Sequence, residues 1–114
     1  MQINIRKKNN PDHCIVDMEG DFDLYSAYDV RDQIEKLISE GNIRFLFNMQ
    51  KVNYVDSTGI GVFVRIMLLL KEKQGLMRLF NVNEAPLKVL KLTMLVQMLG
   101  VCNSEEEAIQ AMNN

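Results

Sequence analysis

An apolar strand that passes almost directly into an apolar helix is the feature that most constrains the fold of this chain. Residues 43–47 form a compact apolar run, and residues 53–61 (NYVDSTGIG) follow it and open a second apolar stretch. A run of the first kind suits a strand buried on both faces, in a sheet that helices cover. Ser57 can begin the helix as its N-cap, because a serine oxygen accepts hydrogen bonds from the free N–H groups of the first turn. This joint predicts an α/β fold with a hydroxyl at a strand-to-helix corner.

The rest of the chain alternates short strand-like runs with longer helix-like runs, which favours a single α/β domain over residues 1–114. Strands are expected over residues 2–7, 14–19, 43–47 and 76–82, whereas residues 96–101 fit either a short strand or a loop. The order then predicts a mixed sheet of four or five strands with about four helices packed mainly on one side.

Turn and cap residues bound the expected helices. Asp23 is the expected N-cap of the first helix, and Gly41 is expected just past its C-terminus. The second helix is expected over residues 57–74, and the third runs from the cap Asn83 to residue 92. Ser104 and Glu107 form a capping box for a last helix that ends near residue 112.

Composition excludes several classes of function. The formal net charge of −2 argues against a nucleic-acid-binding protein, since such domains usually carry a basic excess on one face. The only two cysteines, Cys14 and Cys102, form neither a CxxC pair nor a metal set, and the only histidine is His13. No signal peptide and no apolar run of about 20 residues is evident, so we expect a cytoplasmic protein without a membrane segment.

The joint at Ser57 allows a structural and a regulatory interpretation. Gly59 and Gly61 each cost up to about 1 kcal/mol in a helix relative to alanine. Two such costs need a reason, such as the close approach of another backbone, from within the domain or from a partner. The joint lacks the lysine of a phosphate-binding loop and the first glycine of a nucleophile elbow. Ser57 is therefore either a simple cap or an accessible site for a phosphoryl group.

The expected helix after Ser57 is apolar on nearly all sides. One apolar stripe would be enough for a helix that docks on a sheet. The additional apolar side chains can be covered by a neighbouring helix, or they can form an exposed protein-binding patch. The sequence leaves both alternatives open.

Four stretches of the chain resemble the STAS domain of anti-sigma factor antagonists, bacterial signalling proteins that regulate transcription. They are MEGDFD at residues 18–23, YVDSTGIG at 54–61, LFNV at 79–82 and LKVLKLT at 87–93. The resemblance covers essentially the whole length. Two positions depart from the family pattern: Met94 stands where a glycine is frequent, and Asn48 where an aspartate is common. The departure at Met94 concerns the turn after the third helix.

The resemblance implies that Ser57 is phosphorylated by an anti-sigma factor that is itself a serine kinase of the GHKL type. The unphosphorylated chain would bind that kinase and free a sigma factor, and a serine phosphatase would reset Ser57. The resemblance implies no catalytic residues, no cofactor and no metal for the chain itself. The chain would therefore not be an enzyme. The implied partner-binding residues are Asp21, Asp23, Asp56, Ser57, Thr58, Gly59, Ile60 and Gly61.

Two alternative hypotheses for the function remain. The same fold could serve as a scaffold or accessory subunit of a stress-signalling or transport assembly. A different class of protein, a small enzyme or nucleotide-binding protein, could use Asp21, Asp23 and Asp56 as acids or as ligands of a divalent cation.

Overall fold

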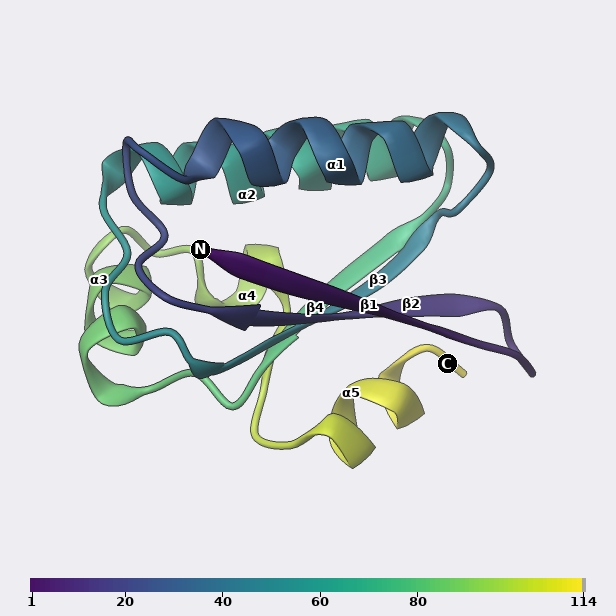
Figure 1. Cartoon of the computed structure of the whole chain (residues 1–114). Helices are drawn as coiled ribbons and strands as arrows, with labels where there is room; N and C mark the ends of the chain where they lie inside the picture. Colours follow the sequence, from purple (N-terminus) through teal and green to yellow (C-terminus); the bar gives the residue numbers. More distant parts are fainter. Residues whose placement is uncertain (114) are drawn as a thin grey trace.

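Five strands form one mixed sheet in a computed structural model that describes residues 1–113 (Figure 1). The strands lie side by side in the order in which they occur along the chain. The first two pair antiparallel, and each later pair is parallel. Their bounds are β1 Gln2–Lys8, β2 His13–Glu19, β3 Arg44–Lys51, β4 Leu76–Phe80 and β5 Val101–Cys102.

Helices connect the parallel strands and cover both faces of the sheet. Helices α1 and α2 lie next to each other across one face, and α5 lies against the opposite face (Figure 1). The bounds are α1 Ala27–Ser39, α2 Ser57–Glu72, α3 Glu84–Leu92, α4 Val96–Leu99 and α5 Glu105–Ala111. This arrangement confirms the predicted α/β fold with helices mainly on one side of a mixed sheet. None of the helices within residues 1–113 has the length and apolar character that crossing a membrane requires.

The alternation of side chains along β3 creates two hydrophobic cores. Phe45 and Phe47 face α1 and α2, where Phe47 packs edge-on against Phe63 of α2 at 5.4 Å between ring centroids. Leu46 points to the other face and joins a smaller cluster beneath α5. Burial of one such side chain contributes about 1.5–3 kcal/mol. Because both faces are buried there, β3 reads as an almost uninterrupted apolar run.

The structure corrects the start of α1 and the role of the side chain that was expected to cap α3. Helix α1 begins at Ala27 with Ser26 at the cap position, not at Asp23. The Asp23 carboxylate instead accepts from the backbone N–H of Tyr25 at 3.0 Å and closes the turn before the helix. Asn83 does occupy the cap position of α3, but its side chain makes no cap hydrogen bond. Its amide donates instead to the carbonyls of Gln50 and Val52, which fixes the end of β3.

Some of the other predicted helix and strand ends agree with the structure, and others differ from it by a few residues. Gly41 has a φ of 99° just after α1, and the Ser104 hydroxyl accepts from the N–H of Glu107, so both predicted helix boundaries are confirmed. Strand β3 extends beyond the expected end at residue 47 to Lys51, and β4 stops at Phe80, before the expected end at residue 82. Residues 96–101, expected as a strand or loop, form α4 and the start of β5.

Helix α2 resolves the two alternatives for its apolar surface. Its inner side is buried against the sheet and α1, including Phe63, Ile66 and Leu70. Leu68 stays 52% exposed on the outer side. Of the other apolar side chains, Val64, Met67 and Leu69 are half-buried, so only part of the apolar excess is covered.

Candidate functional site

Two loops that are distant in sequence meet at the start of α2. Phe22 and Val55 form an isolated parallel bridge beyond the strand ends. The N–H of Phe22 donates to the carbonyl of Tyr54 at 2.9 Å, and the N–H of Asp56 donates to the carbonyl of Phe22 at 3.2 Å. This pairing brings the acidic segment at residues 21–23 beside the joint at residues 56–58.

Asp56, not Ser57, is the N-cap of α2. One carboxylate oxygen of Asp56 accepts from the N–H of Gly59 at 3.0 Å. The other accepts from the N–H of Leu24 at 3.0 Å, so the same carboxylate ties the cap to the neighbouring loop. An aspartate carboxylate at this position also suits the positive end of the helix dipole. The prediction of a Ser57 cap is wrong, and its consequence is that the Ser57 hydroxyl is not needed for capping.

The structure separates the predicted partner-binding residues into exposed and buried groups. Ser57 is exposed at the first position of the helix, and Asp21 is exposed in the facing loop. Thr58, Asp23 and Asp56 are half-buried. Gly59 and Ile60 are buried, Ile60 in the main core, so their proposed part in binding is to hold the joint in place. Gly61 is exposed again on the outer side of α2.

The two glycines of the joint have different surroundings. A Cβ atom on Gly59 would collide with the carbonyl oxygen of Phe22 and lie 2.9 Å from its ring. Gly59 thus permits the close approach of a backbone from within the domain, one of the two reasons considered for these glycines. A Cβ atom on Gly61 would meet nothing within 4 Å. Gly61 therefore leaves an open space on the surface next to Ser57.

Exposed apolar side chains lie near the joint, and the predicted set of partner-binding residues did not include them. They belong to the loop before α1, to α1 and to the loop before α2, and they are Leu24, Tyr25, Tyr28 and Tyr54. Tyr25 is 92% exposed, which is unusual for a side chain with a large apolar surface. Exposed apolar side chains that gather near one site are typical of interaction surfaces. The helical period offered a signal for Tyr28, since this residue falls outside the buried stripe of α1.

A hollow of about 310 Å³ lies beside Ser57 between α1 and α2. Ser57, Thr58 and Gly61 line it from one side, together with Val62 and Arg65 farther along α2. Tyr28 and Arg31 line it from α1, and the Arg31 guanidinium lies 4.9 Å from the centroid of the Tyr28 ring. The sequence reading also missed these two arginines. The signal was the spacing of Ser57, Gly61 and Arg65, since residues four apart share one side of a helix.

Glu35 links the two arginines of this hollow. Arg65 makes two hydrogen bonds to the Glu35 carboxylate, at 2.8 and 3.1 Å, and Arg31 lies 3.6 Å from it. The hydrogen bonds from Arg65 hold the pKa of Glu35 below its usual value. Because the side chain of Arg65 is 54% exposed, this pair contributes little to stability.

Two of the three carboxylates near the joint, those of Asp23 and Asp56, accept hydrogen bonds from donors of the chain itself. Asp56 caps α2 and holds Leu24, and Asp23 accepts from Tyr25 and from the Ser26 hydroxyl. Within residues 1–113, no group of three or more histidine, cysteine, aspartate or glutamate side chains is placed to hold a metal ion. The reading of Asp21, Asp23 and Asp56 as metal ligands therefore receives no support from the geometry.

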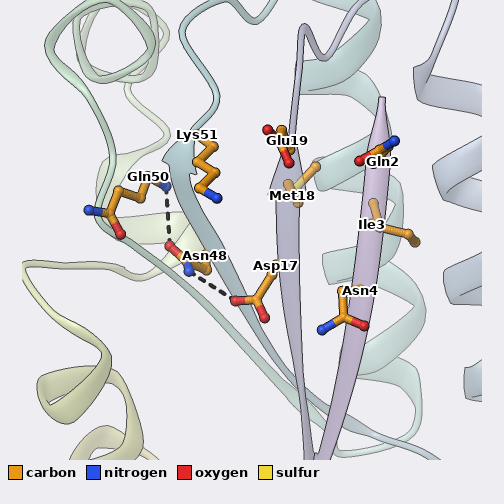
Figure 2. Close-up of a pocket in the computed structure, with 9 residues that line it drawn as sticks. All are labelled: Gln2, Ile3, Asn4, Asp17, Met18, Glu19, Asn48, Gln50 and Lys51. Carbon is orange, nitrogen blue, oxygen red and sulfur yellow. Dashed lines mark hydrogen bonds between the residues drawn. The ribbon is translucent and has the colours of Figure 1, made fainter.

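A second, more polar hollow lies on the sheet near the start of β1 and the ends of β2 and β3 (Figure 2). Asp17 and Asn48 lie at its centre, where the Asn48 amide donates to Asp17 at 2.9 Å. Arg6 makes two further hydrogen bonds to the same carboxylate. The central polar groups are thus satisfied within the chain. Asn48, where the family pattern favours an aspartate, supplies the donor that a second carboxylate would lack.

A model of the STAS domain family matches residues 4–108. The chain belongs to the STAS domain family. The anti-sigma-B factor antagonist of Bacillus subtilis (strain 168) is 31% identical to this STAS domain over 111 residues, which cover 96% of the chain and 100% of the relative. The protein of the same description from Listeria monocytogenes serovar 1/2a is 30% identical, with 94% and 95% covered.

The fold of this STAS domain is also found in solved structures. The structure of the anti-sigma factor antagonist SpoIIAA in its unphosphorylated form is similar, with a TM-score of 0.83. The similarity covers 98% of this chain and 96% of that chain at 20% sequence identity. The resemblance that four stretches of sequence indicated is thereby confirmed for the family and for the fold.

Proposed function

We propose that this STAS domain is an anti-sigma factor antagonist whose state is set by phosphorylation of Ser57. In the unphosphorylated state it binds an anti-sigma factor and frees the sigma factor. The observation that carries the proposal is the exposed Ser57. Its hydroxyl is free for modification because the Asp56 side chain, not Ser57, caps the helix. The names of relatives that match nearly the whole chain support the same role.

The proposed partner surface consists of Ser57 and the exposed apolar side chains around it. Tyr25 lies in the loop that Asp56 ties to α2, next to Leu24, which is also exposed. Tyrosines in such positions often contribute much of the binding free energy, because they bury a large apolar area with few rotatable bonds. The loop is held by backbone and carboxylate hydrogen bonds, so little order has to be gained on binding.

The modification itself is a phosphoryl transfer from a nucleoside triphosphate. The Oγ atom of Ser57 forms a bond to the γ-phosphorus, the bond from that phosphorus to the departing diphosphate breaks, and the hydroxyl proton passes to a base of the kinase. The chain contributes an accessible nucleophile at a fixed helix start. It is the substrate in this step and carries no catalytic role of its own.

A phosphate on Ser57 would oppose binding for two physical reasons. It adds roughly −1.5 to −2 charge at pH 7 next to the carboxylates of Asp56 and Asp23. In an interface formed by Tyr25 and Leu24 it would also lose hydration. A loss of about 3 kcal/mol would weaken binding roughly a hundredfold, since about 1.4 kcal/mol corresponds to a factor of ten. The helix dipole opposes this by only about 0.3–1 kcal/mol.

The finer partner assignments belong to the same proposal. The kinase is an anti-sigma factor of the GHKL type, and a serine phosphatase removes the phosphate from Ser57. Such a cycle acts on transcription, so its proposed place is the cytoplasm. A STAS domain that served only as a scaffold or transport accessory would keep the fold and would lack this cycle.

Incubation with a candidate anti-sigma factor kinase and MgATP, followed by mass spectrometry, tests the site. We expect one phosphate on Ser57 and none on the Ser57→Ala variant, because that substitution removes the accessible hydroxyl and leaves the cap at Asp56 intact. Phosphate found only at Thr58 or Ser26 would refute the assignment to Ser57.

Binding of the same kinase provides the second measurement. We expect Ser57→Asp to weaken binding at least tenfold by calorimetry, since a carboxylate adds charge to the proposed interface. Ser57→Asn is the matched neutral control and is expected to bind more tightly than Ser57→Asp. Equal affinity of the wild type and Ser57→Asp would contradict the switch.

A further inference from the structure

We propose that Arg31 and Arg65 form an intramolecular binding site for a phosphate on Ser57. In this site the phosphate competes with Glu35 for the two arginines, so that phosphorylation rearranges the ion pairs between α1 and α2. The inference rests on the proposed phosphorylation of Ser57 and adds a role for residues outside the joint.

The hollow beside Ser57 places the required groups on one surface. Ser57 and Arg65 line it from α2, and Arg31 lines it from α1. Its volume of about 310 Å³ is ample for a phosphate group and its hydration water. A guanidinium presents several N–H donors in a plane, which matches the oxygens of a phosphate in a bidentate arrangement.

Gly61 keeps the path between Ser57 and Arg65 open. Ser57, Gly61 and Arg65 follow one another at intervals of four residues, so they lie along the same side of α2. Side chains on a helix lean towards its N-terminus, which directs Arg65 towards Ser57. A Cβ atom on Gly61 would meet nothing within 4 Å, so no neighbouring group fills the intervening space. This gives a reason for the second glycine of the joint, since no close approach of the kind seen at Gly59 requires it among the described residues.

The present partners of the arginines can be exchanged. Arg65 pairs with Glu35 at the surface, where such pairs are weak and are screened by salt. Arg31 contacts Asp32 at 2.9 Å and is held over the ring of Tyr28, which keeps it at the edge of the hollow. A phosphate dianion carries more charge than a carboxylate and offers three acceptor oxygens. Two effects oppose the phosphate in this site. The carboxylates of Asp56 and Asp23 repel it, and those of Glu35 and Asp32 compete with it for the two arginines.

Such a site would reinforce release of the partner. In the free protein the arginines compensate the new charge, so the phosphorylated state is tolerated. In a complex over the same surface, the phosphate would have to leave these arginines or be buried together with them. The arginines would therefore stabilise the phosphorylated chain more when it is free than when it is bound to the partner.

The test uses the full chain with phosphoserine incorporated at position 57 by an expanded genetic code, so that no kinase is required. The second pKa of the phosphate is measured by ³¹P NMR titration for the otherwise wild-type protein and for Arg31→Gln/Arg65→Gln. We expect the pKa to be lower in the wild type by at least about 0.5 unit, because nearby positive charges favour the dianion. The difference should shrink in high salt.

Two further variants separate a local site from a general charge effect. Lys71→Gln removes one positive charge from α2 outside this hollow, and it should leave the pKa nearer the wild-type value than Arg65→Gln does. Gly61→Leu fills the open path and should raise the pKa. Equal pKa values in the wild type and the double variant, or equal effects of Lys71→Gln and Arg65→Gln, would overturn the proposal.

Failure of this site is distinguishable from failure of the proposed function. If no kinase modifies Ser57 but the pKa of the incorporated phosphate depends on Arg31 and Arg65, the site exists and the regulatory cycle is wrong. If a kinase modifies Ser57 but the pKa is independent of the arginines, the cycle stands without the site. Circular dichroism of each variant checks that the fold is retained.

Discussion

At the scale of single residues, Gly59 and Gly61 show that one residue type can serve opposite purposes two positions apart. The main chain of Phe22 packs against Gly59 so closely that any side chain there would collide with it. That contact keeps the loop before α1 beside the start of α2. Gly61 faces open space, since a Cβ atom there would meet no atom of residues 1–113 within 4 Å. Its cost to helix stability is therefore uncompensated in the isolated chain.

Alanine substitutions at the two glycines should change stability in opposite directions. Gly59→Ala should lower the free energy of unfolding by about 1–3 kcal/mol, because the added methyl overpacks the joint. Gly61→Ala should raise it by up to about 1 kcal/mol, the usual difference between the two residues in a helix. Urea denaturation of both variants measures this. Changes of the same sign would contradict the conclusion that Gly59 is tightly packed and Gly61 faces open space.

At the scale of elements, the end of α3 explains the family's preference for glycine where this chain has Met94. Met94 has a φ of 61°, the left-handed conformation that glycine adopts at lowest cost. Its N–H donates to the carbonyl of Lys91, and the N–H of Leu95 donates to the carbonyl of Leu90. These two bonds are the pair that defines a Schellman motif. The turn after α3 is thus formed despite the departure from the family pattern, and Met94 occupies its left-handed position.

Met94→Gly should stabilise the protein by about 1 kcal/mol. The substitution relieves the left-handed strain of a side chain with a Cβ atom, and it loses little packing because Met94 is 86% exposed. Met98→Gly is the matched control, since Met98 is also exposed but lies within α4, and it should destabilise by about 1 kcal/mol. Thermal unfolding of both variants measures these changes in stability. A loss of stability in Met94→Gly would show that the left-handed conformation of Met94 does not strain the fold.

At the scale of the whole molecule, one arginine joins the first two strands to the last helix of the chain. Arg6 of β1 binds Asp17 of β2 through two hydrogen bonds of 2.7 and 2.9 Å. It also binds Glu105 at the start of α5, 99 residues away, at 2.7 Å. Burial pushes the pKa of Asp17 upward, but the hydrogen bonds from Arg6 and Asn48 outweigh this and leave the pKa below its usual value.

Asp17 should make the stability of the fold depend on pH in the acid range. A carboxyl with a lowered pKa in the folded state stabilises the protein above the ordinary pKa, near 4, and this contribution is lost as pH falls through the folded pKa. Asp17→Asn should therefore be less stable than the wild type at pH 7, with a difference that narrows from about pH 5 downward. Urea midpoints between pH 7 and pH 3 measure it. Arg6→Gln should reduce the same pH-dependent difference; a constant difference for Asp17→Asn would contradict the assignment.

The sequence by itself determined the features that short windows encode. The apolar run of β3, the period of α1 with Gly41 behind it, and the capping box at Ser104 predicted the fold class and several helix ends. Helical periods and turn chemistry act over a few residues, so no distant contact is needed to read them. The position of Ser57 at a strand-to-helix corner could be recognised in the same way.

Only the tertiary structure decided how the groups of the joint are used. The bridge between Phe22 and Val55 joins residues 33 positions apart, and it turns the Asp56 carboxylate into the cap that the sequence had assigned to Ser57. The packing of α1 against α2 likewise places Arg31 and Arg65 in one hollow. Such pairings depend on the relative orientation of two backbone segments, which long-range contacts set and which no local pattern of residues records.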